Sequence, residues 1–87
     1  MYRLLVKLKP PTYSQNHLYF DFELPVQAPA RFSIFEPGGW SVFLSEDIFP
    51  TGPHTMRVPR SAFRVPGKHY CFLNTPLGVA KLEFDVE

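Results

Sequence analysis

The sequence predicts an all-β fold, a small antiparallel β-sandwich of about seven short strands. Ten prolines are spread along the chain. They leave no window long enough for a regular helix, because proline lacks the backbone N–H and clashes with the preceding turn. Between the prolines, apolar and polar residues alternate with the period of two that is typical of half-buried strands. Since this pattern also fits a closed sheet, a small β-barrel is the alternative fold.

The length and composition predict a single domain over residues 1–87. A chain of 87 residues lies near the lower end of what one hydrophobic core supports. The hydrophobic fraction of 45%, with nine Phe and four Tyr, supplies large side chains for such a core. We therefore expect an aromatic core between two packed sheets.

The first two strands are predicted at residues 2–8 and 18–24. In the first strand, the apolar residues at the even positions 2–8 alternate with Arg3, Leu5 and Lys7, and the strand ends at Pro10-Pro11. The second ends at Pro25 and directs four apolar side chains inward: Leu18, Phe20, Phe22 and Leu24. The segment between the two strands, residues 11–17, is predicted to be a polar loop.

A β-hairpin is predicted in the middle of the chain. Residues 30–36 and 40–44 alternate on either side of Pro37-Gly38-Gly39, the strongest turn signal in the sequence. If the strands pair regularly, Phe35 and Phe43 share one face. The opposite face then carries Phe32, Ile34, Val42 and Leu44.

The second half of the chain is predicted to hold three more strands. A long polar connection over residues 45–53 leads to a short strand at 54–58, whose end at Pro59 must lie on an edge or at a bulge. A loop over 60–67 precedes strands at 68–73 and 79–86. The last strand alternates most regularly, with Ala80, Leu82, Phe84 and Val86 on its inner face.

The charge distribution indicates one candidate binding surface. A formal net charge of +1 excludes a dominant field over the whole molecule. No acidic residue falls between Asp47 and Glu83, and this interval contains a basic stretch over residues 57–68. The candidate partner-binding residues are Arg57, Arg60, Phe63, Arg64, Lys68 and Lys81.

These side chains suit more than one kind of partner. Arginine pairs with carboxylates of a protein, and with an interleaved aromatic it also holds phosphates while a base stacks. The small net charge makes a protein the expected partner, and a nucleic-acid-binding barrel is the alternative. The alternative without any partner is that these charges and prolines are solubilising residues, which prevent an edge strand from pairing with another chain. The outward aromatics suggest a second surface: Tyr13, Tyr19, Phe35, Trp40 and Phe43. Such a patch is typical of association or of the second sheet face of a barrel, and a carbohydrate-binding module, with a sugar stacked on Trp40 or the tyrosines, is the further alternative.

The sequence predicts no enzymatic activity, no cofactor and no metal site. Its histidines, His17, His54 and His69, fall in separate segments without the close spacing of metal ligands. Asp21 and Glu23 alternate as on the wet face of any half-buried strand. Cys71 lies in an apolar run, so we expect a buried small hydrophobe and not a nucleophile.

Several short motifs follow one another from Leu18 onward. A strand ends in Leu24-Pro25, a Phe-x-Ile-Phe segment spans residues 32–35, and a glycine turn follows at Gly38-Gly39. A Gly-x-His-x-x-x-Val segment then covers 52–58, before Gly67-Lys68-His69-Tyr70 and a closing strand with an early lysine, Lys81. In this order the motifs resemble the immunoglobulin-like C-terminal sorting domains of bacterial type IX secretion cargo and the related Ig-like domain of the flagellar hook-capping protein. The resemblance implies an Ig-like sandwich whose partner, a secretion or assembly apparatus, recognises the terminal strand from Lys81 to Val86.

The remaining expectations concern location. No apolar stretch approaches the ~20 residues of a membrane-spanning helix, and the start of the chain lacks the pattern of a secretory signal. A complete chain is therefore expected in the cytoplasm, and an excised sorting domain at the cell surface or outside the cell. In either case we expect a non-enzymatic protein-binding module.

Overall fold

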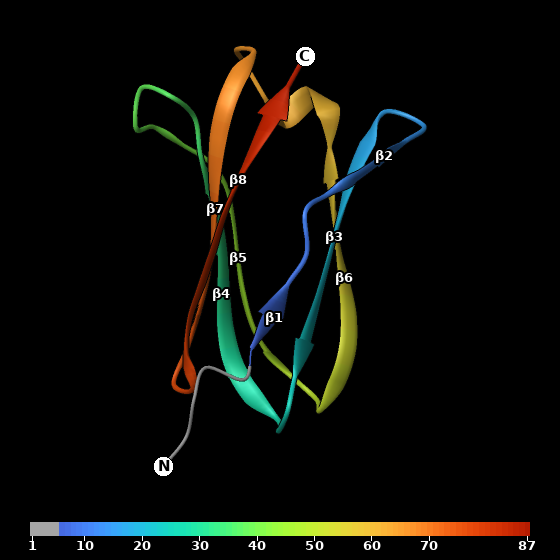
Figure 1. Ribbon diagram of the computed structural model, residues 1–87, viewed down its shortest axis with the longest axis vertical. Helices are drawn as coiled ribbons and strands as arrows, with labels where there is room; N and C mark the ends of the chain where they lie inside the picture. Colours follow the sequence, from blue (N-terminus) through green and yellow to red (C-terminus); the bar gives the residue numbers. More distant parts are fainter. Residues whose placement is uncertain (1–5) are drawn as a thin grey trace.

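Two antiparallel β-sheets pack face to face in the computed structural model, which describes residues 6–87 (Figure 1). Sheet A contains β1 (Lys7–Leu8), β2 (Thr12–Ser14), β3 (His17–Leu24) and β6 (Gly52–Pro59). Sheet B contains β4 (Ala28–Phe35), β5 (Ser41–Phe49), β7 (Gly67–Thr75) and β8 (Gly78–Val86). A 3₁₀ turn, η1 (Arg60–Ala62), follows β6. The predicted sandwich is confirmed. The described strands number eight and do not close into a barrel, so the alternative fold is wrong.

The central strand of sheet A is β3. Strands β1 and β2 pair with one side of it in succession, as shown by the pairs Lys7–Glu23 and Thr12–Tyr19. Strand β6 pairs with its other side along the whole length, from His17–Pro59 to Leu24–Gly52. Sheet B has the order β5-β4-β7-β8, so β5 and β8 form its edges.

The core is the predicted layer of aromatic side chains between the sheets. Phe20 of β3 meets Phe32 of β4 and Phe84 of β8 edge to face, with ring centroids 5.2 and 5.1 Å apart. This geometry is the favourable one for aromatic quadrupoles. The inner faces predicted for residues 18–24 and 79–86 are confirmed, because all eight of their apolar inner side chains are buried or half-buried.

The predicted loop over residues 11–17 is partly wrong, because it contains β2 and a two-residue hairpin turn. Gln15 and Asn16 both adopt positive φ, 48° and 65°. Two consecutive left-handed residues give the turn whose twist matches that of the flanking strands, so Thr12–Ser14 can pair with β3. Of the strand predicted at 2–8, residues 1–5 lie outside the described residues, and only Lys7–Leu8 pair in the described part.

The hairpin of β4 and β5 is confirmed, but its predicted faces are wrong beyond the turn. Ile34 pairs with Phe43, whereas the next residue, Phe35, pairs with Ser41, so Val42 is an extra residue on β5. Such a bulge shifts the alternation by one position, and a shift of one residue exchanges the two faces of a strand. Phe43 therefore packs on the core against Phe32, and Leu44 is exposed on the outer face.

The polar connection predicted over residues 45–53 is mostly wrong, since β5 continues to Phe49 and β6 begins at Gly52, which leaves only residues 50–51 between the strands. This segment pairs with the start of β4, from Phe32–Ser45 to Ala28–Phe49. Because β5 lies on an edge, its polar residues remain in contact with water, which explains why periodicity did not reveal the strand.

Candidate protein interface

The structure separates the residues of the predicted binding surface. Arg57 lies on the outer face of sheet A, opposite Tyr19. Lys68 and Lys81 lie on the outer face of sheet B, at positions paired with Asp85 and Phe72. The sandwich core stands between these two faces, so the basic stretch does not form one continuous patch.

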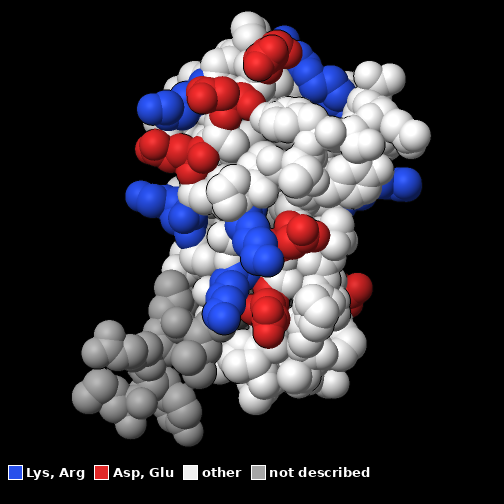
Figure 2. Space-filling model, turned by 45° about the vertical axis from the view of Figure 1, so that its right-hand side comes forward, with Lys and Arg blue, Asp and Glu red and all other residues white. Residues whose placement is uncertain are grey.

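Lys68 and the remaining members of that set are engaged within the domain. The Lys68 ammonium lies 3.8 Å from the Glu83 carboxylate. Arg60 donates to the backbone carbonyls of Phe63, at 3.2 Å, and Glu87. Arg64 forms an ion pair with Glu36. Phe63 is buried against His69 and Phe84, with ring centroids 5.2 and 6.0 Å away, so it cannot stack on a ligand. Figure 2 shows basic and acidic side chains interspersed on the face in view.

Sequence reasoning missed two buried polar residues at the end of β4 and the start of β7. The Glu36 side chain is only 3% exposed, and its Oε2 atom has no hydrogen-bond partner among the described residues. His69 is fully buried, and its Nδ1 atom is hydrogen-bonded to the Gly67 carbonyl at 2.9 Å. Its Nε2 atom has no hydrogen-bond partner among the described residues. The even spacing from Phe32 and Ile34 would have placed Glu36 on the inner face, which is the signal that could have found it.

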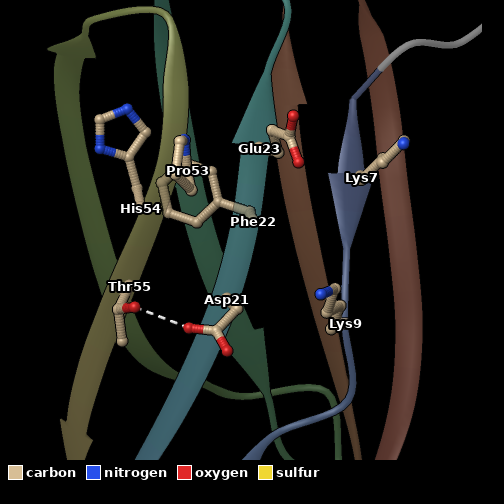
Figure 3. A pocket seen from close by; sticks show the side chains of 8 residues that line it. All are labelled: Lys7, Lys9, Asp21, Phe22, Glu23, Pro53, His54 and Thr55. Atoms are coloured by element: carbon tan, nitrogen blue, oxygen red, sulfur yellow. Dashed lines mark hydrogen bonds between the residues drawn. The ribbon is translucent and has the colours of Figure 1, made fainter.

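A charged groove lies on the outer face of sheet A (Figure 3). It holds about 390 Å³ and receives Lys7 and Lys9 from one side and Asp21 and Glu23 from β3. Thr55 donates to Asp21 at 2.6 Å. Since two ammonium groups balance two carboxylates, the groove prefers neither anions nor cations.

The three histidines of the domain are held in local contacts. Each histidine bonds a nearby backbone carbonyl: His17 that of Gln15, His54 that of Pro50 and His69 that of Gly67. Cys71 is buried as predicted, and burial raises the pKa of its thiol to about 12. Among residues 6–87, no group of three His, Cys, Asp or Glu side chains could hold a metal ion. The same residues include no helix long and apolar enough to cross a membrane.

The edges of sheet B offer a different kind of site. Strand β5 is nine residues long, contains no proline and pairs only with β4 within the described chain. Two of its large apolar side chains, Leu44 and Ile48, are 59% and 63% exposed. An exposed edge strand presents unpaired backbone N–H and C=O groups, to which another extended chain can bond.

The backbone groups that face this edge can be assigned from the pairing. The Ile48 N–H donates to the Asp47 side chain at 2.7 Å. Its partner on β4 is Pro29, which has no N–H. Ile48 is therefore directed to the free edge. Because successive residues of an antiparallel strand direct their backbone groups to opposite sides, Leu44 and Glu46 face the edge as well.

A groove on the outer face of sheet B lies beside this edge. Phe35 and Phe72 meet edge to face in it, with ring centroids 5.7 Å apart, and Leu44 forms part of its wall. Its polar lining comes from Arg31, Ser33, Ser41 and Asn74. Of the predicted outward aromatics, only Phe35 lines this groove; Tyr19 is on sheet A, and Phe43 is on the core side.

No known protein family, curated protein or solved structure matches this chain.

Proposed function

We propose that the domain is a non-enzymatic protein-binding module that adds an extended segment of another protein to the free edge of β5. The observation that carries this proposal is the nine-residue edge without proline, on which Leu44 and Ile48 are exposed. In strand addition, the backbone supplies affinity and pockets for alternate side chains supply specificity. The groove of Phe35, Leu44 and Phe72 supports this proposal, because it lies beside the edge and has a largely apolar lining.

The charges near the edge support a partner with a particular pattern of side chains. Glu46 and Asp47 are both exposed, and Arg31 pairs with Glu46 at 3.1 Å. One carboxylate, that of Asp47, thus has no cationic partner among the described residues. The expected partner segment carries two apolar residues four positions apart, opposite Leu44 and Ile48, and a basic residue near Asp47.

A displayed library of random twelve-residue peptides, selected on the purified domain, tests this proposal. The amide NMR signals of residues 43–48 should shift when a selected peptide is added. Glu46→Pro, which removes one edge-facing N–H, should weaken binding by roughly tenfold. Arg57→Glu is the control, because it changes a charge on the other sheet. Shifts confined to Arg57, Arg60 and Arg64 would instead support the basic stretch as the site.

The nucleic-acid alternative has a separate test. Binding of a generic single-stranded oligonucleotide should weaken linearly with salt on logarithmic axes if phosphate contacts drive it. The dispersal of the basic side chains favours the protein partner.

The resemblance to sorting domains adds a more specific version of the proposal. In that version the partner belongs to a secretion or assembly apparatus and recognises the terminal strand from Lys81 to Val86. Fusing residues 1–87 behind a secreted reporter, in a bacterium that has the type IX system, tests it directly.

A further inference from the structure

The other edge of sheet B, strand β8, has a sequence that complements itself. Like β5, it has nine residues and no proline, and it pairs only with β7 within the described chain. Its outer face carries Val79, Lys81, Glu83 and Asp85, all exposed. Charges of both signs on one edge allow an antiparallel copy of the same strand to match them.

The free backbone groups of β8 can be assigned in the same way as those of β5. The Tyr13 hydroxyl donates to the Asp85 carbonyl from outside sheet B, so this carbonyl is directed away from β7. The Gly78 carbonyl accepts a bond from the Thr75 side chain of β7 at 2.9 Å, so even-numbered residues are directed toward β7. By alternation, the four exposed residues of β8 direct their N–H and C=O groups to the free edge.

We propose that the domain forms a two-fold symmetric dimer in which β8 pairs antiparallel with β8 of a second copy, centred on Leu82. This register overlaps the whole strand, because Gly78 lies opposite Val86. It makes hydrogen-bonded pairs of the edge-facing residues, Lys81 with Glu83 and Val79 with Asp85, each occurring twice. Lysine thus faces glutamate at both symmetry-related positions, and no like charges lie opposite each other.

On the inner face, this register places side chains of complementary size opposite each other. The small Ala80 lies opposite the large Phe84, and Leu82 meets Leu82 at the axis. Phe84 and Ala80 are buried within the monomer, whereas Leu82 is only half-buried, so pairing would complete its burial. The two cores would then be continuous across one eight-stranded sheet.

An open groove of about 630 Å³ beside β8 provides space for the second strand. It lies between β8 and the segment that precedes β3, with Pro10, Pro11, Tyr13 and Phe84 in its lining. In the dimer, the narrow Gly78–Ala80 end of the second strand lies next to this groove. The Val79 N–H of that strand replaces the Tyr13 hydroxyl at the Asp85 carbonyl. Tyr13 is therefore a competitor of the second copy.

Sedimentation equilibrium of the purified chain at increasing concentration tests the proposal. The 10.0 kDa chain should reach about twice this mass. Lys81→Glu sets Glu against Glu83, and Glu83→Lys sets Lys81 against Lys, so each variant should dimerise roughly tenfold more weakly. Far-UV circular dichroism verifies that both variants fold, and Arg57→Glu controls for a charge change on the other sheet.

The decisive measurement mixes the two variants. In a heterodimer of Lys81→Glu with Glu83→Lys, both symmetry-related positions again hold one acid and one base, so the mixture should regain the affinity of the unmodified chain. A monomer at every concentration, or variants that dimerise normally, would overturn the proposal. Failure of the mixture to associate would overturn the register. Glu46→Pro should leave the dimer intact, which separates this proposal from peptide binding at β5.

Discussion

The edges of sheet A and the edges of sheet B differ in how they are protected. On sheet A, Pro53 and Pro59 lie on β6, and Pro10-Pro11 divides β1 from β2. On sheet B, neither β5 nor β8 contains a proline, and each runs for nine residues. Proline cannot donate to a ladder, and short or interrupted strands pair poorly with other chains. The prolines of this chain therefore interrupt the edges of sheet A and leave those of sheet B continuous.

The largest expected effect on stability comes from proline substitutions in β5, where two variants at adjacent positions can be compared. Ser45 donates toward β4, so Ser45→Pro removes a ladder bond and should lower the free energy of unfolding by ~3 kcal/mol or more. Glu46 faces the free edge, so Glu46→Pro should cost only about 1 kcal/mol. Urea unfolding of the two variants measures the difference. Equal losses would show that the edge-facing assignment is incorrect.

The next largest effect is expected in the buried centre of sheet B, where Cys71 should make the free energy of unfolding depend on pH. Because burial raises the pKa of Cys71 to about 12, the folded protein retains the thiol proton at pH values where the unfolded chain loses it. The unfolded state therefore binds fewer protons between about pH 9 and pH 12. In this window the free energy of unfolding should fall by up to about 1.4 kcal/mol per pH unit, while below pH 9 it should not depend on this group.

Cys71→Ala isolates that contribution, since lysines and tyrosines titrate in both proteins. The difference between the two stability curves should be constant below pH 9 and should change above it. A difference that remains constant up to pH 11 would mean that the thiol is reached by water.

A smaller effect is expected at the turn that holds β2 on sheet A. Asn16 has a φ of 65°, which a β-branched residue adopts only with strain. Asn16→Val should lower the free energy of unfolding by about 1–2 kcal/mol. Asn16→Gly is the matched control and should be neutral or slightly stabilising. If thermal unfolding does not distinguish the two variants, the hairpin is not formed as described.

The smallest change in stability is expected when the protected edge is opened. Pro53→Thr combined with Pro59→Val supplies β6 with two N–H groups and should change the free energy of unfolding by no more than about 1 kcal/mol. Light scattering at high concentration should nevertheless show more association than in the unmodified chain. Unchanged solubility would indicate that the prolines of β6 do not protect it.

The regular parts of the fold could be predicted from sequence, and the departures have local causes. The inner faces of residues 18–24 and 79–86 follow from alternation, because each strand has one dry and one wet face. The bulge at Val42 is invisible to alternation, since both Phe43 and Leu44 are apolar and either could face inward. The length of β5 could not be predicted either, because an edge strand tolerates Ser45, Glu46 and Asp47 in contact with water.

The candidate site was predicted less well than the fold. Clustering in the sequence suggested one basic surface, but Arg57 lies on sheet A and Lys68 on sheet B, while Arg64 forms an ion pair with Glu36. Proximity along a chain that alternates between two sheets does not imply proximity in space. The sequence alone makes Lys81 a candidate, whereas its proposed match to Glu83 depends on the edge position of β8.

Because Val42 is an extra residue in the hairpin of β4 and β5, the chain can lose one residue there without a change in strand pairing. Since Ile34 pairs with Phe43 and Phe35 with Ser41, removal of Val42 would leave every other pair of the hairpin with its present partner. A shortened chain would therefore keep Phe43 in the core and Leu44 on the outer face. A deletion on the other side of the pair, between Phe43 and Phe49, would exchange the two faces of everything that follows on β5.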